Sequence, residues 1–169
     1  MSYYLSLQLS HIPFVMINAR YAGMSCPCLR VDDEAGGYQA AMHLIELGHT
    51  RIAGFFKTDD LQGVERLKGF MRAVERYGLT ISPAHIVMYS STDKHTRPIE
   101  AAKQLLTAKE RPTALVCYND ELAVKLLEPI REAGLSVPEQ LSIVGFDDAF
   151  LATATEVKLT TLTHPKQEM

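Results

Sequence analysis

Short apolar runs alternate with amphipathic segments along most of the chain. The runs that predict strands are IPFVMI (12–17), RIAGFF (51–56), IVMYS (86–90), TALVCY (113–118), LSIVGF (141–146) and VKLTTLT (157–163). IPFVMI, TALVCY and LSIVGF are apolar almost throughout, which is typical of strands that are buried on both faces of a parallel sheet.

The segments between these runs have apolar residues at helical spacing, and several end at a glycine. The first predicted helix starts after Asp32-Asp33-Glu34 and has Tyr38, Ala41, Met42 and Ile45 on one face. The second spans about 63–77, with Val64, Leu67, Met71 and Val74 on one face, and the third spans 96–107. The fourth follows Asn119-Asp120, has Leu122, Leu126 and Ile130 on one face, and ends at Gly134. Pro129 lies inside the last of these helices and predicts a kink there.

Strands that alternate with helices of 12 to 15 residues predict βαβ units and a parallel sheet covered on both faces. The fold class is therefore α/β, with a doubly wound parallel sheet. A chain of 169 residues is long enough to bury a core of this kind.

The composition is that of an ordinary globular protein, with 47% apolar and 22% charged residues. A formal net charge of −3 does not fit a chain that binds nucleic acid through its overall charge. The N-terminal residues lack the pattern of a signal peptide, and no apolar run is long enough to span a bilayer, so we expect a cytoplasmic protein without a membrane partner. The three cysteines, Cys26, Cys28 and Cys117, are expected to be reduced thiols.

Polar side chains follow four of the predicted strands. They are Asn18 and Arg20 after the first strand, Lys57, Asp59, Asp60, Gln62 and Arg66 after the second, Asn119 and Asp120 after the fourth, and Asp147 and Asp148 after the fifth. Ligands of open parallel sheets bind at the carboxyl ends of the strands, so these residues are the candidate site. Carboxylates, an arginine and an asparagine together suit a ligand with many hydroxyl groups.

Each of these residues also has a purely structural alternative. Asp32, Asp120 and Asp148 could instead cap helix N-termini, and the same alternative applies to Asp147. Arg66 could be a solvated helix residue. The spacing of the residues alone leaves these alternatives open.

The motifs of common enzymes are missing from the sequence. There is no GxGxxG or GxxxxGK[ST] phosphate cradle, no GxSxG nucleophile elbow and no HExxH pair. Asp147 and Asp148 could form a general acid/base pair, but adjacent side chains at a strand end tend to point apart. We therefore expect no enzyme, no metal and no cofactor.

Several segments in register resemble the effector-binding domain of the lactose/galactose repressor family. They are HIPFVMIN, VDDEAGGYQAAMHLIELGHTRIAGF, ERLKGF, RPTALVCYNDELA, SVPEQLSIVGFDDAFLA and LTTL, and together they cover nearly the whole chain from His11 onward. The resemblance implies a periplasmic-binding-protein-like fold of two lobes, with a sugar bound between them. FFKTDDLQGVERLKGF and EVKLTTLTHPK are most similar to members that regulate arabinose operons in Gram-positive bacteria.

The resemblance also implies a role for particular residues. Arg66, Asn119 and Asp147 fall on ligand-contacting positions of the family, and Asp60 and Gln62 fall on loop positions that face the ligand. Asn18 stands where many members have an aspartate, which weakens its assignment to the site. Asp148 corresponds to a structural cap or to a residue on the hinge side.

Most of the chain corresponds to the C-terminal lobe of the family. We expect 1–22 to be the end of the N-terminal lobe and a crossover, 23–155 to be the C-terminal lobe, and 156–169 to be a truncated return crossover. The implied function is a transcriptional repressor that senses a sugar, such as L-arabinose or another pentose. The implied partners are operator DNA, bound through a domain outside this chain, and a second copy in a homodimer. A periplasmic sugar-binding protein of a transporter and a sugar-modifying enzyme are the alternatives.

Overall fold

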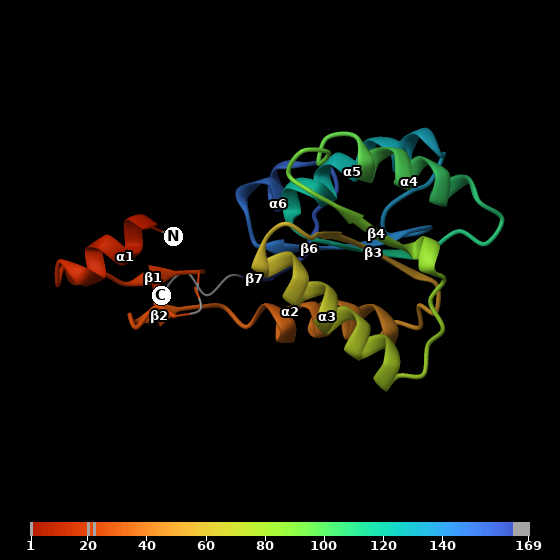
Figure 1. The fold of residues 1–169 in the computed structure, drawn as a ribbon. Helices are drawn as coiled ribbons and strands as arrows, with labels where there is room; N and C mark the ends of the chain where they lie inside the picture. The colour runs from red at the N-terminus through yellow and green to blue at the C-terminus, as the bar shows by residue number, and fades with distance from the viewer. Residues whose placement is uncertain (1, 20, 22, 164–169) are drawn as a thin grey trace. The chain divides into compact units, whose positions relative to one another are not determined.

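The computed structural model describes residues 2–19, 21 and 23–163 and divides into two units, 1–32 with 165–169, and 33–164. The larger unit contains helices and strands in strict alternation (Figure 1). Its elements are α2 (Asp33–Glu46), β3 (Ile52–Lys57), α3 (Leu61–Arg76), the short 3-10 helix η1 (Pro83–His85), β4 (Ile86–Tyr89), α4 (Arg97–Thr107), β5 (Ala114–Cys117), α5 (Asp120–Glu132), β6 (Ser142–Asp147), α6 (Phe150–Ala154) and β7 (Thr160–Thr163). The predicted α/β class is confirmed.

The five strands of this unit form one parallel sheet in the order β4-β3-β5-β6-β7. From β3 the chain winds outward through α3 to β4, then returns past β3 through α4 to β5. The winding direction therefore reverses between β3 and β5, and ligands of doubly wound sheets bind at such a switch point.

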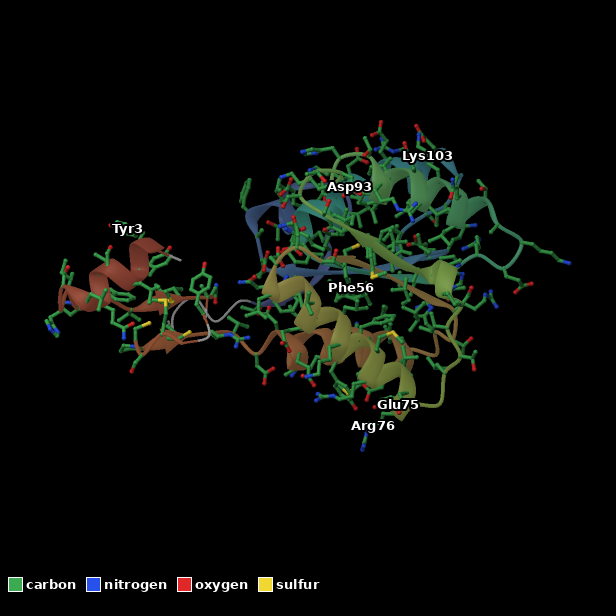
Figure 2. The ribbon with its side chains drawn as sticks, in the orientation of Figure 1. Tyr3, Phe56, Glu75, Arg76, Asp93 and Lys103 are labelled. Atoms are coloured by element: carbon green, nitrogen blue, oxygen red, sulfur yellow. The ribbon has the colours of Figure 1, made fainter. Side chains whose placement is uncertain are left out.

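Helices cover both faces of the sheet, with α2 and α3 on one face and α4, α5 and α6 on the other (Figure 1). Phe55 and Phe56 are neighbours in β3 and belong to the two different core clusters, because successive side chains of a strand point to opposite faces. The ring of Phe56 lies 5.4 Å from that of Phe70 in α3. Glu75 and Arg76 point away from the sheet at the end of α3 (Figure 2).

The amino-terminal edge of the sheet is held by His49, which comes from the turn after α2. Its two ring nitrogens lie 2.9 Å from the hydroxyl of Thr113 and 3.0 Å from that of Ser142. Burial lowers the pKa of His49, so the imidazole is neutral at pH 7, with one nitrogen donating and the other accepting. The polar candidate residues lie at the opposite, carboxyl edge.

The predicted face of α3 was wrong at two of its four residues. Val64 and Met71 are 45% and 43% exposed, whereas Phe70 and Ala73 are fully buried. The reason is that glycines allow α3 to pack closely against α2, which turns Val64 and Met71 toward solvent. The predicted face of α2 is confirmed, since Ala41 is fully buried and Tyr38 and Ile45 pack against the same core cluster. The predicted face of α5 is confirmed, and this helix continues through Pro129.

The smaller unit contains α1 (Ser2–Leu9), which was not predicted, and two strands, β1 (Met16–Ile17) and β2 (Cys28–Leu29), paired in parallel. The predicted buried strand 12–17 was wrong in length and burial. Only its last two residues pair, and Ile12, Val15 and Ile17 are 50–62% exposed. Within the described residues, β1 pairs with the two residues of β2 alone. All three cysteines are free thiols. Among the described residues, no helix has the length and apolar character to cross a bilayer.

Candidate functional site

Arg66 is the centre of a polar cluster at the carboxyl edge of the sheet. It lies in α3 and is only 5% exposed. Its Nε donates to Asp33 Oδ1 at 2.9 Å, Nη1 donates to the carbonyl oxygen of Tyr118 at 2.6 Å, and Nη2 forms an ion pair with Asp147 Oδ1 at 3.5 Å. A guanidinium is planar and rigid and carries five N–H donors, so it can donate to several acceptors at once. Arg66 therefore links α2, the end of β5 and the end of β6.

Two aromatic rings hold the guanidinium in place. The Cζ atom of Arg66 lies 3.5 Å from the ring centroid of Phe146 and 5.1 Å from that of Tyr118. Cation–π contacts of a desolvated guanidinium contribute on the order of 2 kcal/mol. Arg66 is thus a buried, fixed charge, and the alternative of a solvated helix residue is wrong.

Two glycines allow α2 and α3 to approach closely enough for this arrangement. A Cβ atom at Gly37 would lie 2.0 Å from the carbonyl oxygen of Arg66, and one at Gly69 would lie 1.9 Å from the carbonyl oxygen of Glu34. Any larger residue would force the two backbones apart. The close packing brings Asp33, at the start of α2, within reach of Arg66.

Asp60, which lies in the loop between β3 and α3, is the centre of a second polar cluster. It is the N-cap of α3, and its Oδ1 accepts from the backbone N–H of Gly63 at 2.8 Å. Its Oδ2 accepts from Lys57 Nζ at 2.8 Å and from the Tyr118 hydroxyl at 2.9 Å. Burial favours the neutral acid, but these hydrogen bonds outweigh it and lower the pKa of Asp60. The bond to Asp60 is also the main reason that the pKa of Lys57 is raised.

Asn119 and Gln62 lie at the first turns of two helices that start from this edge. Asn119 is the N-cap of α5, and its Oδ1 accepts from the N–H of Leu122 at 3.0 Å. It also lines a small pocket of about 130 Å³ at the ends of β3, β4 and β5, together with Lys57, Tyr89, Lys94, Tyr118, Glu121, Leu122 and Lys125. Gln62 is half-buried in the first turn of α3.

Asp147 ends β6 in an unusual backbone conformation, with a φ of 100°. Its side chain is 38% exposed while one of its oxygens faces Arg66. A carboxylate that is anchored by a buried cation and still reaches solvent can accept further hydrogen bonds from hydroxyl groups.

The structure brings five of the six predicted site residues to one edge of one sheet. These are Asp60, Gln62, Arg66, Asn119 and Asp147. Asn18 belongs to the other unit, where it has a φ of 54° and its N–H donates to the carbonyl oxygen of Leu29 at 2.8 Å. That all six bind a ligand stays a prediction.

Two predicted caps were wrong. The N-cap of α5 is Asn119, and Asp120 is the first residue inside the helix. The N-cap of α6 is Ala149, without a side-chain cap bond, because the chain turns through positive φ at both Asp147 and Asp148 before the helix begins. That Asp32 caps the N-terminus of α2 stays a prediction.

Asp33 and Tyr118 are site residues that sequence reasoning missed. Asp33 was placed only at the start of a predicted helix, and nothing in its spacing indicates a contact 33 positions away. Tyr118 was treated as the last residue of a strand, although its place directly before Asn119 puts it at the same edge. Both bond to the predicted residues Arg66 and Asp60.

The edge is a candidate binding site by the chemical groups that it offers. It combines fixed carboxylates, a buried guanidinium, a phenol and aromatic faces, a donor and acceptor set that suits a polyhydroxylated ligand. In the described part of the chain, no group of three or more His, Cys, Asp or Glu side chains could hold a metal ion.

Fold and edge together define a class of binding protein, and comparison with known families agrees. The family described as "Periplasmic binding protein-like domain" matches residues 41–169, and the chain belongs to this family.

The curated relatives are regulators. The chain is 60% identical over 171 residues to an arabinose metabolism transcriptional repressor of Geobacillus stearothermophilus, covering 100% of the chain and 47% of the relative. It is 51% identical to an arabinose metabolism transcriptional repressor of Halalkalibacterium halodurans, with coverages of 99% and 45%. The chain thus spans about half the length of these relatives.

A solved structure agrees in fold. A regulatory protein of the LacI family from Chloroflexus aggregans is similar with a TM-score of 0.87 and 29% identity, over 98% of this chain and 59% of that one. The resemblance to the lactose/galactose repressor family is confirmed.

Proposed function

We propose that this chain is the sugar-sensing part of a bacterial transcriptional repressor, with L-arabinose or another pentose as its effector. The observation that carries the proposal is the 60% identity, across the whole chain, to a repressor of arabinose metabolism. The relatives and the solved structure described above are regulators, which favours a repressor over a transporter component and over an enzyme.

The geometry supports a sugar as the ligand. Asp147 would accept from sugar hydroxyls while Arg66 fixes its orientation, and Asn119, Asp60 and Gln62 would contribute from the neighbouring loops. Hydrogen bonds with a charged partner contribute about 1.5–3 kcal/mol each, so three or four of them can orient a pentose.

The regulatory step in this proposal is a population shift. The sugar would favour a state of the whole protein in which a DNA-binding domain, outside this chain, no longer fits its operator. A ligand can shift such an equilibrium only by its difference in affinity for the two states. Since repression acts on DNA, the protein would work in the cytoplasm.

We also propose that the repressor is a homodimer, because paired DNA-binding domains recognise paired half-sites.

Calorimetric titration of the protein with a panel of pentoses and hexoses tests the proposed effector. We expect saturable heat with a pentose and weaker binding of hexoses, because the proposed effector is L-arabinose or another pentose. Absence of saturable heat with every sugar of the panel would contradict the proposal.

A further inference from the structure

Asp120 is a buried acid that does not face the candidate ligand. It is the first residue of α5 and is 1% exposed. One carboxylate oxygen, Oδ1, accepts from the hydroxyl of Thr161 at 2.6 Å, and the other, Oδ2, accepts from the backbone N–H of Ala149 at 2.8 Å. Its place in the first turn of a helix also favours its negative charge.

The hydroxyl of Thr161 connects this carboxylate to a further backbone amide, that of Asp148. While it donates to Asp120, its oxygen accepts from the backbone N–H of Asp148 at 3.3 Å. A hydroxyl can donate and accept at the same time. The carboxylate therefore holds two successive amides of the segment after β6, that of Ala149 directly and that of Asp148 through Thr161.

A glycine in β6 provides the space for this connection. Gly145 pairs with Thr161 in the ladder between β6 and β7. A Cβ atom at Gly145 would lie 2.1 Å from Asp120 Oδ1. The Asp120 carboxylate therefore lies against β6 at a position where only glycine leaves room for it. Asp120 of α5, Thr161 of β7 and the segment after β6 together form one hydrogen-bonded unit.

The segment that this unit holds is the one that carries the proposed ligand acceptor. Asp147 and Asp148 have φ values of 100° and 47°, a region that L-amino acids rarely adopt. Strained backbone of this kind persists only when the surrounding structure fixes it. The hydrogen bonds that Thr161 and Asp120 accept come from the backbone N–H groups of Asp148 and Ala149, the two residues that follow Asp147.

We propose that Asp120 is a positioning residue, which holds the segment 147–149 so that the carboxylate of Asp147 faces both Arg66 and the ligand. This inference rests on the proposed function, in which Asp147 accepts from a sugar. Asp120 and Thr161 would not touch the sugar themselves. They would act through the backbone that aims Asp147.

Substitutions at Thr161 test the relay without removing the buried charge. Thr161→Val keeps the shape but loses the hydroxyl, and we expect about fivefold weaker sugar binding in calorimetry. Thr161→Ser restores the hydroxyl and should bind within about twofold of wild type. Thr160→Val, in the same strand, is the matched control and should have no effect. Equal affinities of the Thr161→Val and Thr161→Ser variants would overturn the proposal.

Asp120→Asn tests the carboxylate itself. An amide loses the negative charge, and its –NH2 group can bond Thr161 only in reverse, by donating to a hydroxyl that already accepts from Asp148. We therefore expect about tenfold weaker binding. In an Asp147→Ala background the same substitution should change affinity by less than about twofold, because the group that it positions is gone. Additive losses in the double variant would show a merely structural role and overturn the proposal.

Amide hydrogen exchange makes the inference testable apart from sugar binding. In Thr161→Val, the amides of Asp148 and Ala149 should exchange faster than in wild type, while those of β5 should not change. If wild type binds no sugar, the proposed function fails, and this exchange pattern still decides whether the hydrogen-bonded unit holds the segment. Unchanged exchange at both amides would overturn the positioning role.

Discussion

Arg66 shows how a single buried charge can organise a binding edge. Burying a guanidinium is unfavourable unless its donors are satisfied, and here Asp33, the Tyr118 carbonyl oxygen and Asp147 satisfy them. Of its two carboxylate partners, Asp33 is 5% exposed and Asp147 is 38% exposed. The buried partner fixes the arginine, and the exposed partner is left accessible to a ligand.

Asp147→Ala should therefore weaken sugar binding by about tenfold to a hundredfold, the worth of one or two charge-assisted hydrogen bonds. The measurement is calorimetric titration of the variant and wild type with the same pentose. Asp93→Ala, in the loop between β4 and α4 (Figure 2), is a control in which another acid is lost and affinity should stay within about twofold. Equal affinity of Asp147→Ala and wild type would remove Asp147 from the site.

Prediction from sequence worked well for residues that directly follow a strand. Asp60, Asn119 and Asp147 could be placed at one edge because parallel strands bring their carboxyl ends together. Asp33 could not be found, since its contact with Arg66 depends on how closely two helices pack. The separate roles of Asp147 and Asp148 were expected, but Asp148 lies in a left-handed turn and does not cap α6.

At the scale of elements, the contact between α2 and α3 determines where Arg66 lies. Gly69 approaches the backbone of Glu34, and Gly37 approaches the backbone of Arg66. The salt bridges of Glu34 with Lys68 and Arg72 close the solvent side of the same contact. The position of Arg66 in the candidate site therefore depends on the packing of α2 against α3.

Gly69→Ala should destabilise the protein by about 2 kcal/mol or more, because the new methyl group meets backbone that cannot rotate away. In an unconstrained helix the same change stabilises by roughly 0.5–1 kcal/mol, so the expected sign is reversed. Urea unfolding followed by circular dichroism measures it. Glu75→Ala, on the exposed side of α3, should change the free energy of unfolding by less than about 0.5 kcal/mol. A stabilised Gly69→Ala variant would contradict the close packing.

The positions of the strands and helices of the larger unit along the chain followed from apolar periodicity, whereas the buried face of α3 did not. Periodicity weights large apolar residues such as Val64 and Met71, and it gives glycine no weight. The actual contact uses the absence of a side chain at Gly37 and Gly69. The face of α5 was predicted because Leu122, Leu126 and Ile130 pack in the ordinary way.

At the scale of the whole molecule, the larger unit is a five-stranded sheet with both faces covered by helices and a polar edge at its switch point. The chain spans about half of the repressors that it resembles. In the two-lobe arrangement that the family implies, a sugar on this edge would be covered by a second lobe. The regulatory role proposed here therefore depends on coupling between the sugar and DNA, and this coupling is reciprocal.

The most direct test is to titrate the intact protein with L-arabinose, alone and bound to DNA from its target promoter. If the sugar favours the state that releases DNA, bound DNA must weaken sugar binding by the same factor, typically fivefold or more for allosteric regulators. We predict a clearly lower apparent affinity for L-arabinose on DNA than off it, with D-glucose binding more weakly than L-arabinose in both cases. An affinity for L-arabinose that is the same with and without DNA would contradict the proposed function.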